Sequence, residues 1–207
     1  MEKSFQKIIQ TSIELFTKLG VKRVTMDEIA RECMISKKTL YKYVNDKIDL
    51  INQVINFESK KLSKKFFAIS EKGLNAVEEV FELHRNLIKL MKSHNHTVEY
   101  DLRKYYPSIQ RDVSERRAKQ VYQMMVMNLK KGIEEGLYYD DIDIELIAKQ
   151  RVIFQVQRIE NSIVSYKEFT NPYAMKQMFI YHLRAICSPK GMEILNEKIK
   201  ELFNDEE

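Results

Sequence analysis

Apolar residues recur at intervals of three and four along almost the whole chain, and this spacing predicts amphipathic helices. The first apolar stripe runs from Phe5 to Leu19, and Gly20 follows where the C-terminal cap of a helix is expected. No stretch of any length alternates apolar and polar residues as a half-buried strand does, and only 5 Gly and 3 Pro interrupt the 207 residues. The pattern therefore predicts an all-α protein.

Three more helices are predicted before residue 70, each from a start signal. Thr25 and Glu28 have the spacing of a capping box, which begins a helix of about nine residues in the segment TMDEIAREC. Ser36 is a good N-cap for a third short helix that continues to about residue 44. Asn45 or Asp46 can cap a longer fourth helix that continues to about residue 70.

The third helix has one basic and one apolar face. A projection at about 100° per residue places Lys37, Lys38, Tyr41 and Lys42 on one side, and Leu40, Tyr43 and Val44 on the other. Residues 1–65 hold 14 Lys and Arg against 8 Asp and Glu, whereas residues 66–207 hold 21 against 22. A run of lysines is usually a solvated surface, but positive charge confined to one end suits duplex DNA, which carries one negative charge per about 1.7 Å.

Two short helices joined by a tight turn form a helix-turn-helix, whose second helix enters the major groove of DNA. Residues 4–52 resemble the DNA-binding domain of the TetR family of transcriptional regulators, above all in the segment TMDEIARECMISKKTLYKYVNDKIDL. The resemblance implies that Ile29 and Ala30 pack the second helix on the third. Two residues depart from the family pattern. Met34 stands where the family has Gly in a turn that favours positive φ, and Val44 stands where it has Phe.

The resemblance also implies which residues contact DNA. Phosphate contacts are implied for Thr25, Tyr41 and Lys47. Contacts to bases or to the adjacent backbone are implied for Lys37, Lys38, Thr39 and Tyr43. Ser36, at the start of this helix, and Lys42, which faces either phosphate or solvent, complete the candidate set. Tyr43 lies at the edge of the apolar face, so a packing role is an equal alternative for it.

These observations divide the chain into a helix-turn-helix domain at residues 1–47 and a helical domain at residues 48–207. In the TetR family the second part binds an effector and forms a homodimer, and the long helices expected here are about Ile144–Ser165 and Pro172–Cys187. Candidates for the effector pocket are Tyr100, Tyr105, Tyr122, Met125 and Phe154. Candidates for the dimer interface are Ile159, Ile163, Phe179 and Leu183. Core packing is the simpler interpretation of any single one of these residues.

Other chemistry has little support in the sequence. His94 and His96 could join His84 or His182 at a metal, but no Cys or carboxylate has the spacing of a zinc site, so neither a metal nor a cofactor is expected. The chain has no glycine-rich phosphate loop and no nucleophile elbow, which argues against an enzyme. The two cysteines are far apart and are expected to be reduced, buried thiols. The first 20 residues lack the apolar stretch of a signal peptide or membrane anchor, so a cytoplasmic protein is expected.

The combined interpretation is a ligand-responsive transcriptional regulator, most simply a repressor, that binds double-stranded DNA. It would bind a palindromic operator as a homodimer and be released by a small molecule. The alternative is a helical interaction protein whose basic end meets an acidic protein partner or an anionic membrane surface. A membrane-surface helix needs a long apolar face, and the basic helix of this chain is too short to supply one. Neither the operator nor the effector has a signature in the sequence.

Overall fold

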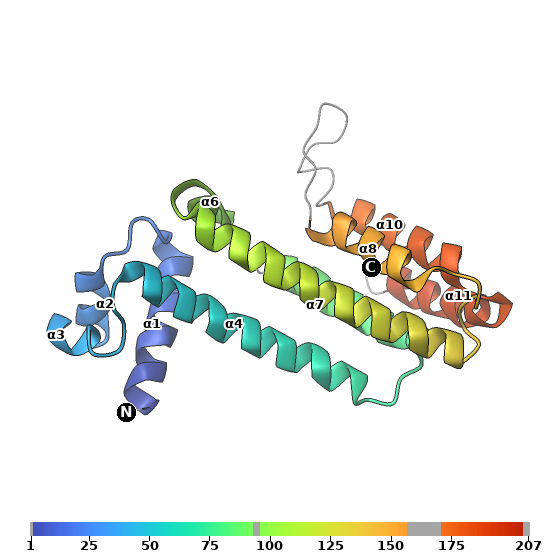
Figure 1. Cartoon of the computed structure of the whole chain (residues 1–207), viewed down its shortest axis with the longest axis horizontal. Coiled ribbons are helices and arrows are strands. Elements are labelled where there is room, and N and C mark those ends of the chain that lie inside the picture. Colours follow the sequence, from blue (N-terminus) through green and yellow to red (C-terminus); the bar gives the residue numbers. More distant parts are fainter. Residues whose placement is uncertain (1, 93–95, 157–170, 205–207) are drawn as a thin grey trace. The chain divides into compact units, whose positions relative to one another are not determined.

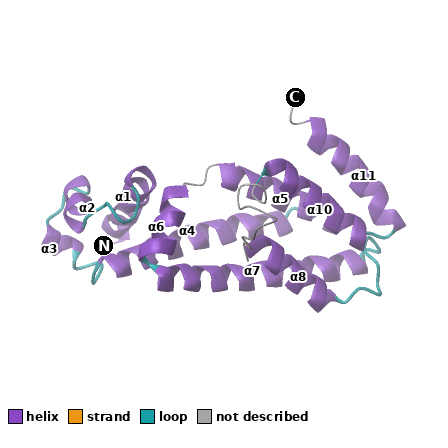
Figure 2. Ribbon diagram, turned by 90° about the horizontal axis from the view of Figure 1, so that it is seen from above, coloured by secondary structure: helices purple, strands orange, loops and turns teal. Residues whose placement is uncertain are grey.

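The computed structural model describes residues 2–92, 96–156 and 171–204 (Figure 1). Within these ranges the chain forms ten helices and no strand. Figure 2 shows the helices in purple. The all-α prediction is therefore confirmed. None of the helices in these ranges is both long enough and apolar enough to cross a membrane.

The helices form two compact units. Unit 1 comprises Met1–Phe66 and Ser93–Ser114, and unit 2 comprises Phe67–Lys92 and Glu115–Glu207. The predicted division into residues 1–47 and 48–207 stays a prediction. Unit 1 is larger than the first of these segments because it also includes residues 48–66 and the described residues 96–114.

Unit 1 is built on the short helices that the start signals predict. Its helices are α1 (Glu2–Leu19), α2 (Met26–Glu32), α3 (Lys37–Leu40), most of α4 (Lys47–Ser70), α6 (His96–Tyr105) and the start of α7 (Pro107–Glu134). α2 lies beside α1, and α3 lies beside α2 (Figure 1). Its core includes Ile8, Ile9, Phe16, Ile29, Leu40 and Leu50, and α6 and α7 add Leu102 and Ile109. A chain segment from beyond residue 90 thus completes the core of the helix-turn-helix.

The predicted caps are present. Gly20 has a φ of 86°, and its N–H donates to the carbonyl of Phe16 over 2.9 Å. Thr25 and Glu28 form the reciprocal capping box at the start of α2. Asp46 caps α4, because its carboxylate accepts the N–H of Asp49 over 2.8 Å. α3 is shorter than predicted, since it ends at Leu40 and continues only as hydrogen-bonded turns.

Unit 2 contains the other long helices. They are α5 (Ala76–Lys92), α8 (Ile144–Val156), α10 (Pro172–Ile186) and α11 (Pro189–Asn204), with the end of α4 and most of α7. α11 packs against α5 and α10. The core includes Val77, Phe81, Leu129, Phe179, Leu183 and Leu195. The predicted helix at about Ile144–Ser165 is confirmed as far as Val156, and residues 157–165 lie outside the described residues.

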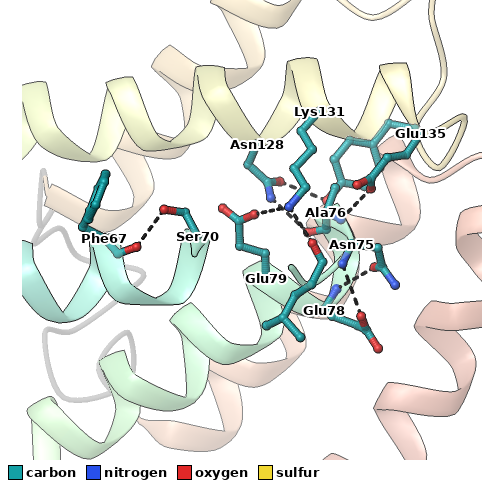
Figure 3. A network of polar contacts seen from close by, with 11 residues as sticks. Phe67, Ser70, Asn75, Ala76, Glu78, Glu79, Asn128, Lys131 and Glu135 are labelled. Atoms are coloured by element: carbon teal, nitrogen blue, oxygen red, sulfur yellow. Dashed lines mark hydrogen bonds and ion pairs between the residues drawn. The ribbon is translucent and has the colours of Figure 1, made fainter. Parts of the chain in front are cut away.

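A polar network fixes the start of α5 to the end of α7 (Figure 3). The Lys131 ammonium donates to Glu79 over 2.7 Å, and the Glu135 carboxylate accepts the N–H of Ala76 over 2.7 Å. The Asn128 amide donates to the Ala76 carbonyl over 2.9 Å and accepts the Tyr138 hydroxyl over 3.0 Å. Most of these bonds satisfy backbone or buried polar groups that would otherwise lose their hydrogen bonds to water, so the network has a structural role.

Candidate nucleic-acid interface

The turn between α2 and α3 is a Schellman motif built on a methionine. Met34 has a φ of 57°, and 86% of its surface is exposed. Its N–H donates to the carbonyl of Arg31, and the N–H of Ile35 donates to the carbonyl of Ala30, both over 3.0 Å. These are the two hydrogen bonds that define the motif, whose left-handed position is usually glycine. The positive φ implied by the resemblance is confirmed, and a residue with a Cβ adopts it.

α3 and the turns after it divide into the two predicted faces. Leu40 and Val44 are 0% and 2% exposed and lie in the core of unit 1. The four residues of the basic face are exposed: Lys37, Lys38, Tyr41 and Lys42. The apolar face therefore fixes which side of this segment packs, and the lysines are left facing solvent.

Local hydrogen bonds hold the start of α3. The Ser36 hydroxyl accepts the N–H of Thr39 over 3.0 Å, as the N-cap prediction requires, and lies 2.8 Å from the Thr39 hydroxyl. The Lys37 ammonium forms an ion pair with Asp27 of α2 at 3.0 Å. This hydrogen bond to Asp27 raises the pKa of Lys37. Both side chains of the pair are more than half exposed, so an incoming phosphate can replace the carboxylate.

The two flanking phosphate candidates, Thr25 and Lys47, are held by their neighbours. The Thr25 hydroxyl donates to Glu28 over 2.9 Å and accepts the Glu28 N–H over 3.2 Å. The Lys47 ammonium donates to the carbonyl of Lys22 over 3.1 Å. Burial lowers the pKa of Lys47, and the nearby charge of Lys22 lowers it further. A phosphate beside Lys47 would therefore relieve a repulsion between two ammonium groups.

Asp101 of α6 holds the loop between α1 and α2, and sequence reasoning missed it. Its carboxylate is buried and accepts the N–H of Lys22 over 2.8 Å. A Cβ on Gly20 would lie 2.8 Å from the same carboxylate oxygen. Position 20 therefore requires glycine for two reasons, the positive φ and the close approach of Asp101. Lys22 and Asp101 are 79 residues apart in the sequence, so no local sequence pattern could predict their contact.

Tyr43 packs inside unit 1. Its ring stacks on that of Phe5 with centroids 6.3 Å apart, and it contacts the core formed by α1 and α3. Of the two roles predicted for Tyr43, packing or DNA contact, the contact with Phe5 favours packing for the ring. The other implied DNA contacts stay predictions, and the structure places their side chains on unit 1 around α3 and the adjoining helix ends.

The five pocket candidates are distributed over both units and stay predictions. Tyr100 and Tyr105 belong to unit 1 and are 53% and 40% exposed on α6. Tyr122 and Met125 lie on α7 in the core of unit 2. The side chain of Phe154 lies outside the described residues.

The interface candidates on α10 need correction. Phe179 and Leu183 are 1% and 0% exposed in a single chain, because α10 turns this face into the core of unit 2. Residues Ile159 and Ile163 lie outside the described residues. The exposed apolar side chains of α8 and α10 are instead Leu146, Ile153, Tyr173, Met178 and Tyr181.

Two histidines of unit 2 are enclosed near Phe179. The His84 ring stacks on that of Phe179 with centroids 4.0 Å apart. Burial lowers the pKa of His84 to about 4, and the charges of Arg151 and Lys176 act in the same direction. Burial, and then Arg151, lowers the pKa of His182 to about 4. Both rings are therefore neutral at neutral pH.

The described residues contain no group of three or more His, Cys, Asp or Glu that could hold a metal ion. His94 is outside the described residues, and nothing is described of the His96 side chain. Cys33 and Cys187 are free and buried, as predicted. Burial raises the pKa of the Cys187 thiol to about 12, so it is an unreactive thiol at neutral pH.

Comparison with known proteins identifies the helix-turn-helix. Residues 8–54 match the family model described as bacterial regulatory proteins, tetR family. The helix-turn-helix of this chain is therefore of the tetR type. The match covers α2 and α3 completely, together with most of α1 and the start of α4.

One curated relative and two solved structures are similar to longer parts of the chain. An uncharacterized HTH-type transcriptional regulator of Bacillus subtilis, YerO, is 32% identical over 107 residues, which is 46% of this chain and 37% of YerO. The matched segment thus spans little more than a third of that relative. A TetR transcription regulator from Haloarcula marismortui has a similar fold, with a TM-score of 0.72 and 16% identity over 91% of this chain and 100% of that one.

CprB, a TetR family protein from Streptomyces coelicolor solved in complex with its biological operator sequence, has a TM-score of 0.64 at 16% identity. The alignment covers 99% of this chain and 98% of CprB. At this identity the likeness shows the fold alone, and the tetR fold extends through both units.

Proposed function

We propose that this chain is a DNA-binding transcriptional regulator whose α3 enters the major groove of an operator. The observation that carries the proposal is the two-faced segment at residues 37–44, with Leu40 and Val44 buried and its lysines and Tyr41 exposed. A short helix held by its apolar face on a small core, with its polar face free, is the geometry of a recognition helix. The tetR family match at residues 8–54 and the similar fold of CprB, which was solved with its operator, support the same function.

The regulator acts as a homodimer on a palindromic operator. One helix as short as α3, with only Lys37–Leu40 in helical form, reads few bases, and a two-fold dimer presents two such helices to half-sites about 34–36 Å apart or a multiple of this. The exposed apolar side chains of α8 and α10 are the surface that supports dimerisation. Tyr173 and Tyr181 of α10 are 67% and 72% exposed, and aromatic side chains are enriched at protein interfaces.

Repression relieved by a small molecule is the mode that we propose for this regulator. The ligand would favour a dimer whose two α3 helices no longer match the half-site spacing, and it must bind that state more tightly than the DNA-bound state. Unit 2 is the place for the ligand, because its core of aromatic and aliphatic side chains between helices is typical of small-molecule sites.

Selection of bound sequences from a random duplex library tests the proposal. The wild-type chain is expected to enrich a palindrome, and Lys38→Ala and Tyr41→Ala are expected to weaken its binding. Lys149→Ala and Tyr139→Ala are matched controls in unit 2, since Tyr139 is 45% exposed and Tyr41 is 43% exposed. If the wild-type chain enriches no sequence at low salt, the DNA-binding proposal is wrong and a helical interaction protein becomes the better interpretation.

A further inference from the structure

A second basic surface lies on unit 1, beside the first residue of α4. It comprises Lys22 in the loop between α1 and α2, and Tyr100, Lys104 and Tyr105 on α6, and is called the α6 patch below. The two tyrosines are 53% and 40% exposed. Both lysines are exposed as well.

The tyrosine rings of the α6 patch hold the two ammonium groups. The Lys104 Nζ donates to the Tyr100 hydroxyl over 2.8 Å and lies 5.2 and 5.4 Å from the centroids of the Tyr100 and Tyr105 rings. The Lys22 Nζ lies 4.8 Å from the centroid of the Tyr105 ring. The electron-rich face of an aromatic ring attracts a cation, so these contacts restrict two flexible lysines to one place.

The α6 patch is continuous with the DNA-contacting residues proposed above. The carbonyl of Lys22 accepts the Lys47 ammonium over 3.1 Å, and its N–H donates to Asp101 over 2.8 Å. Lys47, the first residue of α4, is a proposed phosphate contact. The backbone of Lys22 therefore ties the first residue of α4 to α6, and its side chain extends the positive charge from Lys47 towards Tyr105.

We propose that the α6 patch binds backbone phosphates of the same DNA duplex that α3 reads. A duplex offers a phosphate charge about every 1.7 Å along its axis, so a basic surface continuous with Lys47, itself a proposed phosphate contact, meets further phosphates of the same molecule. Lysine and tyrosine side chains both contact phosphates in protein–DNA complexes. Lys22 and Lys104 supply the charge, and Tyr100 and Tyr105 orient them and offer hydroxyl donors.

Phosphate contacts make a specific prediction about salt and sequence. Each phosphate neutralised adds about 0.9 to the slope of log affinity against log salt concentration. Lys104→Ala and Lys22→Ala are each expected to lower the slope by about 0.9, so the affinity lost between about 50 and 200 mM salt becomes about 3.5-fold smaller. The loss of affinity is expected to be equal on the selected palindrome and on an unrelated duplex, because phosphate contacts carry no sequence information.

The measurement is fluorescence anisotropy of labelled duplexes with the full chain across a salt series. Lys149→Ala is the matched control, because the Lys149 ammonium is exposed and donates to a side chain four residues away, as that of Lys104 does. Circular dichroism checks that each variant is folded. Removing an exposed lysine side chain leaves the backbone bonds of Lys22 intact, so loss of folding is not expected.

The outcomes separate this inference from the proposal on which it rests. A lower slope with Lys104→Ala and with Lys22→Ala, but not with Lys149→Ala, supports the α6 patch. Wild-type binding to the palindrome with an unchanged slope in Lys104→Ala overturns the inference and leaves the regulator proposal intact. A change of base preference in either variant also overturns it, since it would mean a base contact. Absence of any DNA binding by the wild-type chain overturns both.

Discussion

Replacing Met34 by glycine is expected to stabilise unit 1. Met34 adopts a φ of 57° at the left-handed position of the Schellman motif between α2 and α3. Its side chain is 86% exposed and so contributes little burial. The backbone hydrogen bonds of the motif, from the N–H groups of Met34 and Ile35, do not depend on the side chain. The substitution therefore changes mainly the backbone strain.

The magnitude follows from two opposing effects. A residue with a Cβ in the left-handed helical region costs about 1–2 kcal/mol, which glycine does not incur. Glycine gives the unfolded chain more conformations, and this offsets about 0.4–1 kcal/mol of the gain. The expected net increase in the free energy of unfolding for Met34→Gly is about 0.5–1 kcal/mol. Met34→Ala keeps the Cβ and is expected to change it by less than about 0.5 kcal/mol.

Hydrogen exchange measures this change locally, which matters because the chain has two compact units. The amides of Ile35 and Leu40 are suitable reporters, since they donate to the carbonyls of Ala30 and Ser36. Where exchange follows the opening equilibrium, their rates are expected to fall about two- to fivefold in Met34→Gly. Amides in α11 serve as an internal control and are expected to keep their rates.

Equal exchange rates in Met34→Gly and Met34→Ala would refute the reasoning, because the two variants differ mainly in backbone freedom. Faster exchange in the glycine variant alone would mean that the methionine side chain stabilises the turn despite its exposure. Operator binding is expected to survive the glycine substitution, because the turn geometry is the one that the tetR family normally builds with glycine.

Two further predictions concern unit 2. Gly132→Ala is expected to lower the free energy of unfolding in urea by about 1–3 kcal/mol, because the new Cβ would overlap the buried Tyr138 ring. The Cβ of Gly136→Ala meets no atom within 4 Å, so this variant is expected to lose only the about 1–2 kcal/mol that a positive φ costs a residue with a Cβ. An unchanged free energy of unfolding in Gly132→Ala would contradict this assignment. The pKa of His84 is lowered to about 4, so this side chain stays neutral in the folded chain at pH values where the unfolded chain, from about pH 6.5 downwards, takes up a proton. The contribution of His84 to stability is therefore present above about pH 6.5 and is lost as the pH falls from about 6.5 to 4. His84→Phe is expected to reduce the loss of unfolding free energy over this range by at most about 3 kcal/mol, and an unchanged pH profile would contradict the burial argument.

Local signals in the sequence were sufficient for the elements of unit 1. The capping box at Thr25, the N-cap at Ser36 and the cap at Asp46 each involve residues three positions apart. These caps therefore form without help from distant parts of the chain. The two faces of the segment at residues 37–44 follow from helical periodicity in the same way. For these reasons the helix-turn-helix and the orientation of its basic face could be predicted from the order of the residues.

Periodicity finds apolar residues but does not say what covers them. α10 has apolar side chains on two faces, and the pattern alone could not show that Phe179 and Leu183 face the core while Tyr173 and Tyr181 face solvent. The same limit explains Tyr100, an aromatic residue predicted in a pocket wall that lies exposed beside a lysine. An aromatic ring can pack in a core, line a pocket or bind a cation, and only its neighbours in the folded structure show which of these it does.

Contacts between distant parts of the chain were decided by the tertiary structure alone. Asp101 holds the loop at Lys22 across 79 residues, and the α6 patch exists only because that loop, α4 and α6 meet in one unit. The sequence by itself determined the helices, their caps and the charged face of α3, because those depend on residues within a few positions of each other. Which helix faces are covered, and which lysines gather, depends on packing across the chain, and only the folded structure fixes it.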